Sequence, residues 1–331
     1  MEQTLYPLRF NPIYKKLIWG GEKLREEYGK TDAPEMTGES WEISMVEDNI
    51  SVVSNGFLKD NTLEEVIEVY MGDMVGDRVY EKYGTFFPIL TKFIHSNDYL
   101  SIQVHPGDEY AMEHHGENGK TEMWYILEAE KDAKLIVGFN RETDRQGFLT
   151  SLNGNTLVDI MNFQPVTKGD VLFMPPGRVH ALGPGIVLAE IQQTSDMTYR
   201  IYDWGRVGAD GKPRELHLEH ALNVIDFDLP SDYKTGYEQR LNRTVMLADC
   251  SYFTTHYLKF DQPVDKDYNL IDSFVIYMCT EGEVDLYYPG VERSGPETLR
   301  KGDTILIPAV LKEISLIPRE TSVLLEVYLR Q

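Results

Sequence analysis

The chain is poor in cysteine and contains no long apolar segment. Its 331 residues include two cysteines, Cys250 and Cys279, which are too few for a disulfide framework, so we expect a reducing compartment, the cytoplasm. No apolar run approaches the about 20 residues that a membrane-spanning helix requires. The opening MEQTLYPLRF also lacks the apolar stretch of a signal peptide. We therefore expect neither membrane insertion nor export.

Basic residues are also scarce. Lysine and arginine together number 32 against 54 aspartates and glutamates, which gives a formal net charge of -22. Such an excess of negative charge repels the phosphates of nucleic acids and anionic membranes, so neither is an expected partner. A phosphorylated small molecule remains compatible with this charge only where basic side chains gather locally. With 331 residues, 42% of them hydrophobic, the chain is long enough for two cores of ordinary size or for one large core.

The most informative stretch is 99–127, YLSIQVHPGDEYAMEHHGENGKTEMWYIL. Apolar and polar residues alternate at its start, and this period of two places Ser101, Gln103 and His105 on one face of a strand. A second β-rich run follows with Glu122 near its start. An amide, an imidazole and a carboxylate that point inward from neighbouring strands suit a divalent metal, whereas an apolar core does not tolerate them unliganded.

A second motif, KGDVLFMPPGRVH at 168–180, supplies the missing ligand. It has the pattern G-x5-P-x-G-x2-H, in which a turn, an apolar strand and a Pro/Gly turn precede His180. The turn residues determine where the strand begins and ends, so His180 arrives at a set place on the next strand. We predict that Gln103, His105, Glu122 and His180 form one metal site of nitrogen and oxygen ligands.

The second motif is repeated near the end of the chain. KGDTILIP at 301–308 restates KGDVLFMP at 168–175. In the second copy, however, Glu313 stands at the position that matches His180, and no histidine follows His256. The chain therefore resembles two related units of which only the first retains its metal ligands.

The expected fold is mainly β. Many short strands separated by Gly/Pro turns favour two jelly-roll β-barrels in tandem, the second without a metal site. The predicted boundary separates a catalytic, metal-binding domain at 1–235 from a degenerate domain at 236–331. A few helices interrupt the strands, one of them capped by Asp108. They are expected at 62–83, 109–115, 141–162 and 217–225.

These motifs together resemble a known family. The pattern G-x5-P-x-G-x2-H resembles the second cupin motif, and SIQVHP, GKTEMWYI, VHALGPG and QTSDMTYRIYDWGR are similar in order to type I mannose-6-phosphate isomerases of the short bacterial form. The likeness covers nearly the whole chain. The cupin motif alone is unspecific, because cupins host many chemistries. The resemblance implies two cupin barrels, one zinc ion per chain, and an isomerase that interconverts mannose 6-phosphate and fructose 6-phosphate through an enediol.

The resemblance also assigns roles to single positions. The four zinc ligands coincide with the metal-site residues predicted above. The catalytic arginine matches Arg200, an acid that contacts the substrate matches Glu190, and a lysine in the pocket matches Lys120. Arg206 replaces a lysine of the long forms, whose helical insertion domain this chain is too short to contain in full. The substrate- and phosphate-binding positions match Lys92, Ser101 and Arg206.

Isomerisation moves a proton between C1 and C2 of an open-chain sugar. The reaction requires a group that polarises the sugar oxygens, and a zinc ion can do this as a Lewis acid. It also requires stabilisation of the enediolate charge, which Arg200 could supply. The proton carrier is either Glu190 or a metal-bound water, and the sequence leaves both open. Lys92, Ser101 and Arg206 would hold the phosphate.

Other interpretations fit parts of the pattern. Two histidines and one carboxylate also suit an iron(II) oxygenase, although Gln103 would fill a position that such chemistry needs open. A non-catalytic sugar-binding cupin would keep the metal for structure alone. Arg200 is either catalytic or the ion-pair partner of Asp196 or Asp203. Glu190 is either the proton carrier or a strand acid paired with a neighbour.

Overall fold

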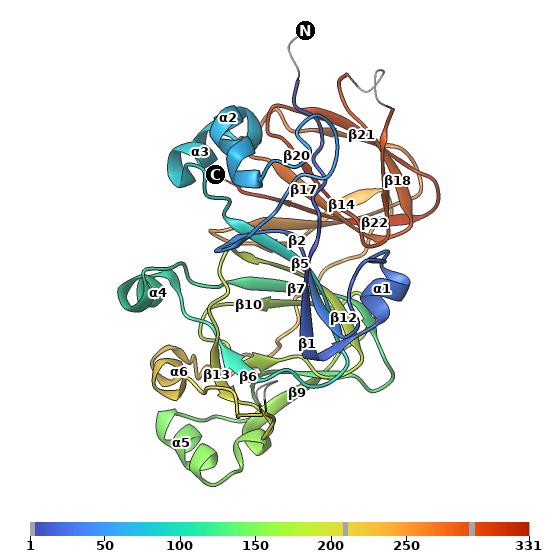
Figure 1. The fold of residues 1–331 in the computed structure, drawn as a ribbon. Coiled ribbons are helices and arrows are strands. Elements are labelled where there is room, and N and C mark those ends of the chain that lie inside the picture. Colours follow the sequence, from blue (N-terminus) through green and yellow to red (C-terminus); the bar gives the residue numbers. More distant parts are fainter. Residues whose placement is uncertain (1–3, 208–210, 291–294, 331) are drawn as a thin grey trace.

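The computed structural model describes residues 4–207, 211–290 and 295–330, and the prediction of a mainly β fold is confirmed (Figure 1). Four large antiparallel sheets are stacked as layers. In Figure 1 the strands coloured blue to yellow-green occupy the lower half, and the orange and red strands occupy the upper half. The two inner layers pack face to face, with the rings of Tyr125 and Tyr257 at a centroid distance of 6.0 Å.

The lower half contains two sheets. The inner sheet has six strands in the order β1 (Ile13–Gly21), β2 (Thr37–Ile43), β5 (Ile89–Ser96), β12 (Ile186–Gln193), β7 (Glu122–Ala129) and β10 (Val171–Met174). The outer sheet has five strands in the order β13 (Tyr199–Tyr202), β6 (Ile102–Val104), β11 (His180–Ala181), β8 (Lys134–Phe139) and β9 (Met161–Pro165). A small hairpin beside them pairs β3 (Met45–Val46) with β4 (Asn49–Ile50).

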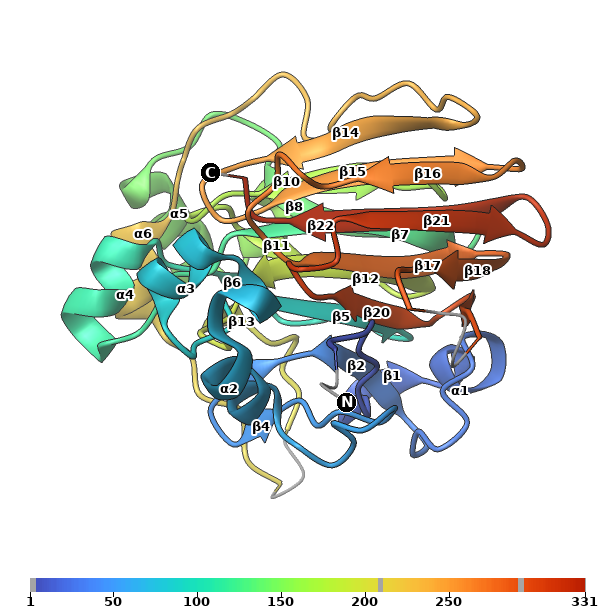
Figure 2. The same ribbon diagram turned by 90° about the horizontal axis from the view of Figure 1, so that it is seen from above.

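The upper half repeats this arrangement, and Figure 2 shows its strands running alongside one another. The inner sheet has the order β14 (Arg243–Asp249), β15 (Thr254–Phe260), β22 (Ser322–Tyr328), β17 (Val275–Glu281) and β20 (Thr304–Ile307). The outer sheet has the order β16 (Val264–Asp267), β21 (Glu313–Pro318), β18 (Glu283–Tyr287) and β19 (Glu297–Arg300).

The sequence repeat noted above occupies matching places in the two halves. Gly169 and Gly302 lie in the turns before β10 and β20, with φ of 89° and 91°, a conformation that glycine adopts at little cost. The N–H of Gly169 donates to the carbonyl of Ile126 on β7, and the N–H of Gly302 donates to that of Cys279 on β17, both at 2.8 Å. β7 and β17 are therefore equivalent strands.

Short helices lie along the edges of the sheets in Figure 1. Helix α2 (Leu63–Val75) begins with a capping box. The N–H of Glu65 donates to Thr62 Oγ1 at 3.2 Å, and the N–H of Thr62 donates to Glu65 Oε2 at 2.8 Å. None of the described helices is long and apolar enough to cross a membrane. The helices are α1 (Lys23–Glu27), α2 (Leu63–Val75), α3 (Asp77–Tyr83), α4 (Asp108–His115), α5 (Arg145–Asn153), the 3-10 helix η1 (Leu157–Ile160) and α6 (Leu218–Val224).

The start of the chain packs against the upper half. Leu8 forms two backbone hydrogen bonds with Leu306 on β20, of 2.8 and 2.9 Å. The end of α2 also contacts this half, since the N–H of Ala309 donates to the carbonyl of Met74 at 3.0 Å. Both contacts cross the predicted boundary at residue 235, so the two halves share a continuous core.

Candidate functional site

The predicted metal ligands come from both sheets of the lower half. Gln103 on β6 lies directly opposite His180 on β11 in the outer sheet. Glu122 is the first residue of β7 in the inner sheet, and His105 follows the end of β6. The space between the two sheets therefore receives an amide and two imidazoles from one side and a carboxylate from the other.

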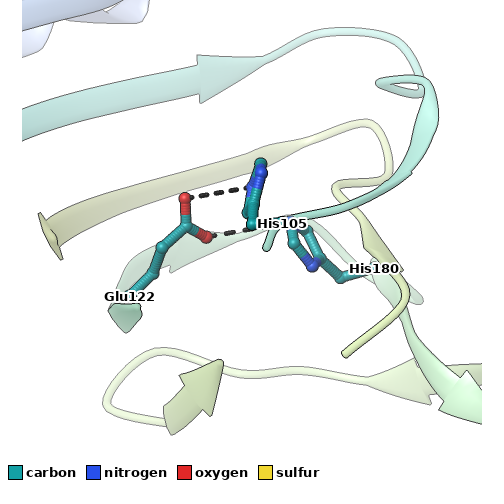
Figure 3. Close-up of side chains that lie close together, drawn as sticks. All are labelled: His105, Glu122 and His180. Atoms are coloured by element: carbon teal, nitrogen blue, oxygen red, sulfur yellow. Dashed lines mark ion pairs between the residues drawn. The ribbon is translucent and has the colours of Figure 1, made fainter. Parts of the chain in front are cut away.

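Three of these side chains meet in a buried group (Figure 3). Glu122 Oε1 lies 3.3 Å from His105 Nε2, and Glu122 Oε2 lies 3.7 Å from His180 Nε2. One donor atom from each of the three residues lies within 4.8 Å of the others. Imidazole nitrogens and a carboxylate oxygen at this spacing can share one divalent ion.

Backbone carbonyls orient the two imidazoles. His105 Nδ1 lies 2.8 Å from the carbonyl of Met197, and His180 Nδ1 lies 2.8 Å from that of Arg178. Each carbonyl accepts a hydrogen bond from Nδ1–H, which leaves Nε2 with its lone pair directed at Glu122. His105 Nε2 and Glu122 Oε2 are buried and have no hydrogen-bond partner in the protein. Unpartnered acceptors at this depth fit a bound cation.

Burial also favours the protonation states that metal binding requires. Burial, followed by the charge of Lys120, lowers the pKa of His105 to about 3, and burial lowers that of His180. Burial raises the pKa of Glu122, but Lys120 and His105 outweigh it and hold that pKa well below its usual range. Two neutral imidazoles and a charged carboxylate are the ligand forms of these residues.

Gln103 is positioned to complete the group. Its Nε2 lies 3.3 Å from His180 Nε2. A half-turn of the amide exchanges Nε2 for Oε1, which is the atom that binds metals. The structure therefore brings all four predicted ligands together.

A cavity of about 300 Å³ opens onto the metal group. Its wall includes most of the residues predicted to act on a substrate, but not His105 or His180. The predicted residues in the wall are Lys92, Ser101, Gln103, Lys120, Glu122, Glu190 and Arg200.

Glu190 on β12 lies between a lysine and an indole. Lys92 on the neighbouring strand places Nζ 3.1 Å from Glu190 Oε1, and Trp124 Nε1 donates to Oε2 at 2.7 Å. Burial and the charge of Glu122 raise the pKa of Glu190 despite Lys92. A carboxyl group with a raised pKa can both accept and release a proton near neutral pH.

Arg200 on β13 lies opposite Gln103 in the outer sheet. Its Nη1 donates to the carbonyl of Glu215 at 2.9 Å, and its buried Nε has no partner in the protein. Among the ion pairs of the described residues, none joins Arg200 to Asp196 or Asp203. Burial and the charge of Arg214 lower its pKa. The side chain of Arg200 thus lines the cavity, and its Nε is a buried donor without a partner in the protein.

Arg206 does not line this cavity. Its Nη2 donates to Asp203 Oδ1 at 2.7 Å, and its Nη1 donates to the carbonyl of Tyr99. Arg214, which the sequence analysis did not single out, lines the cavity instead and binds the same carboxylate. No local pattern marks Arg214, because its position depends on the path of the chain between β13 and α6.

Asp108 holds the loop before β7 through the N–H of Gly119, and the predicted capping role of this aspartate is wrong. Gly107 precedes the helix, and Asp108 is its first residue. Its Oδ1 instead accepts from the N–H of Gly119 and from Gln193 Nε2, each at 2.9 Å, and its Oδ2 accepts from Tyr252 Oη at 2.7 Å. These three donors occupy the carboxylate that would otherwise cap the helix.

Comparisons with known proteins agree with this geometry. The family description "Phosphomannose isomerase type I, catalytic domain" matches residues 8–135. Mannose-6-phosphate isomerase ManA of Bacillus subtilis is 37% identical over 324 residues, which cover 95% of this chain and 96% of that protein. The mannose-6-phosphate isomerase of Streptococcus mutans is 35% identical over 92% of this chain and 93% of its own.

Solved structures show the same fold. The crystal structure of mannose 6-phosphate isomerase from Bacillus subtilis superposes with a TM-score of 0.86 at 31% identity, over 97% of this chain and 99% of that one. The apo form of the Salmonella typhimurium enzyme superposes with a TM-score of 0.78 at 16% identity, over 99% of this chain and all of that one, and supports the fold alone. The family match and the two relatives, each at least 35% identical over more than nine-tenths of both chains, establish that the chain belongs to the type I phosphomannose isomerase family.

Proposed function

We propose that this protein is a metal-dependent aldose–ketose isomerase that interconverts mannose 6-phosphate and fructose 6-phosphate. The observation that carries the proposal is the position of Glu190. This buried carboxyl group, with its raised pKa, lines the same cavity as the metal-ligand group and several cationic side chains. Proton transfer between adjacent carbons of a charged sugar requires each of these parts.

The proposed metal is zinc, held by Gln103, His105, Glu122 and His180. Two neutral imidazoles, an amide and one carboxylate leave a divalent ion with net positive charge. When bound there, zinc would supply Lewis-acid polarisation of the substrate's carbonyl and hydroxyl oxygens.

The protein's own groups would handle the proton and the developing charge. Glu190 takes the proton from one of the two carbons, C1 or C2, and returns it to the other, while Lys92 and Trp124 hold its oxygens in place. The guanidinium of Arg200, which lines the cavity, donates to the enediolate oxygen. Lys120 Nζ lies 3.2 Å from Glu122 Oε1, so it can hold a proton near the reacting oxygens.

The remaining predicted residues would bind the rest of the sugar phosphate. Lys92 and Ser101 line the cavity and contact the substrate. Arg206 lies outside the wall and contributes positive charge to the phosphate end through Asp203. The iron oxygenase and the non-catalytic cupin are not favoured, because neither needs a proton carrier together with this set of cations.

The two halves are proposed to be tandem cupin barrels, with a catalytic domain at 1–235 and a metal-free domain at 236–331. Matching sheet orders support this division. Val275 on β17 is placed against Ile307 as Glu122 is placed against Met174, so the metal-binding carboxylate is lost in the second copy. Two free cysteines and a phosphorylated substrate support a cytoplasmic location.

Proton transfer can be tested directly. In deuterium oxide, a proton carried by an enzyme group through an enediol exchanges with solvent, so proton NMR should show deuterium at C1 of the fructose 6-phosphate that forms. A direct hydride shift would instead keep the substrate's own proton at C1. Turnover should stop after treatment with a chelator, return with zinc, and proceed equally under nitrogen. Oxygen consumption would instead support the oxygenase, and the absence of any turnover would support a binding protein.

A further inference from the structure

Arg214 is a cation of the cavity that neither the motifs nor the family resemblance assigned. It lies between β13 and α6 and lines the cavity together with Gln103 and Glu122. Its Nε donates to Asp203 Oδ2 at 2.7 Å, and its Nη2 donates to Oδ1 of the same carboxylate at 2.5 Å. This two-point contact fixes the plane of the guanidinium, and Nη1 is not engaged by Asp203.

Positive charge exceeds negative charge around Asp203. Arg206 and Arg214 both bind this buried carboxylate, and Arg200 lies beside Arg214, because Arg200 Nη1 donates to the carbonyl of Glu215 at 2.9 Å. Asp98 is 3.8 Å from Arg206, but its side chain is 60% exposed and the pair is weakened by solvent. Two arginines therefore bind one buried carboxylate, and a third, Arg200, lies beside them without an ion pair to it, in a protein whose net charge is -22.

The order of groups along the wall matches the two ends of a sugar phosphate. Gln103, in the metal group, is paired across the sheet with Arg200, and Arg200 is bonded to the residue after Arg214. The reacting carbons C1 and C2 would lie at the metal group, and the phosphate on C6 lies at the other end of the substrate. A guanidinium fork suits phosphate oxygens, and a dianion would neutralise the surplus of positive charge.

Resting on the isomerase function proposed above, we propose that Arg214 binds the substrate's phosphate group directly and that Asp203 positions it. Arg206 then acts through Asp203 and not by contact with the substrate. The specificity for a phosphorylated sugar would thus depend on a residue fourteen positions after the catalytic arginine, in a segment without secondary structure.

The test is a comparison of Arg214→Gln, Arg214→Lys and Arg206→Gln with the wild-type metal-loaded enzyme. Arg214→Gln should raise KM for mannose 6-phosphate at least tenfold, leave kcat within threefold, and raise the Ki of inorganic phosphate in parallel. Arg214→Lys should be intermediate, because lysine keeps the charge but loses the fork. Arg206→Gln should change KM less than Arg214→Gln does. Arg243→Gln, an exposed position on β14, is the control for loss of one positive charge.

A second readout separates this proposal from the proposed function. Trp19, Trp41 and Trp124 line the cavity, so tryptophan fluorescence reports phosphate binding without turnover. If the wild type does not isomerise mannose 6-phosphate but binds inorganic phosphate at least ten times more tightly than Arg214→Gln, the phosphate site stands and the isomerase function falls. If KM, Ki and the fluorescence titration of Arg214→Gln all stay within twofold of wild type, or if Arg206→Gln has the larger effect, the proposal is overturned.

Discussion

Glu190 and Glu326 occupy the same position in the two halves of the molecule. Glu190 on β12 is paired with Lys92 on one side and Trp124 on the other. Glu326 on β22 is paired in the same way with His256 and Tyr277. Both carboxylates are buried and accept a hydrogen bond from the aromatic neighbour, Trp124 Nε1 at 2.7 Å and Tyr277 Oη at 2.9 Å. The surroundings differ, because Glu190 borders the cavity that holds the proposed metal ligands and Glu326 is enclosed by protein donors.

The variant Glu190→Gln should lose activity while keeping its metal. The amide cannot accept and return a proton, and general acid–base catalysis typically contributes about 10²–10⁴-fold. We expect kcat to fall by a factor in this range while the metal content stays close to wild type. Steady-state kinetics and elemental analysis measure both. Some stability is lost with the buried Lys92 pair, but Lys92 keeps Glu39 at 3.4 Å, so the loss should be smaller than in Glu326→Gln. A kcat within threefold of wild type would remove Glu190 from the mechanism.

The matched variant Glu326→Gln should lose stability while keeping activity. Glu326 accepts from Lys266 Nζ at 2.9 Å and from Tyr268 Oη, and the substitution leaves the Lys266 charge without compensation. Breaking a buried ion pair costs about 3–5 kcal/mol, so chemical denaturation should show a free energy of unfolding lower by this amount. The double variant Glu326→Gln/Lys266→Met should recover part of the loss. Equal stability of wild type and Glu326→Gln would contradict the expectation.

Replacement of Arg200 by alanine should separate metal binding from catalysis. We proposed that its guanidinium donates to the enediolate, and removing such a donor typically reduces kcat by about 10²–10³-fold. The four metal ligands are untouched, so elemental analysis should still find one ion per chain. An unchanged turnover number would show that the guanidinium has no part in the reaction.

Removal of one imidazole should abolish metal binding. His105→Gln would replace a nitrogen ligand held by the carbonyl of Met197. We expect the ion content to fall below stoichiometry and the melting temperature to drop, because a ligand that binds only the folded state stabilises it, by about 2.7 kcal/mol at a hundred times its Kd. His114→Gln, on the exposed face of α4, is the control and should retain the ion. Full metal occupancy in His105→Gln would refute the assignment of this ligand.

Stability at low pH should depend on His95, which is buried on β5. Burial, followed by the charge of Lys23, lowers its pKa from 6.5 to about 4. The unfolded chain therefore binds more protons below pH 6.5, and stability is lost as the pH falls from 6.5 towards 4. Between pH 7 and pH 5 the melting temperature of wild type should fall further than that of His95→Gln, which lacks this group. Parallel curves for the two proteins would show that His95 does not contribute.

The strands and the metal group were predictable because their signals are local. Alternation around Gln103 and the turn residues before His180 specify which side chains share a face, and the sequence carries both patterns within a few residues. The helical spacing that predicts a helix from residue 62 is equally local, and α2 begins at Leu63 with Thr62 as its N-cap.

The contacts that were missed join residues far apart in the chain. Asp108 is separated by 85 residues from Gln193 and by 144 from Tyr252, so nothing near it indicates that these donors compete with its helix. Arg206 and Arg214 are the same residue type and lie in the same segment of the chain. The path of the backbone nevertheless places only Arg214 in the wall of the cavity. Tertiary placement of this kind has no short-range pattern.

The pairing of Leu8 with Leu306 has a consequence for synthesis of the protein. Leu8 precedes every strand of the lower half but pairs with β20 in the upper half, so during synthesis it must remain unpaired until β20 appears. Contacts between such distant parts slow folding, because a long loop is closed before they form. An N-terminal truncation past Leu8 should therefore impair the half of the molecule that carries no predicted metal ligand.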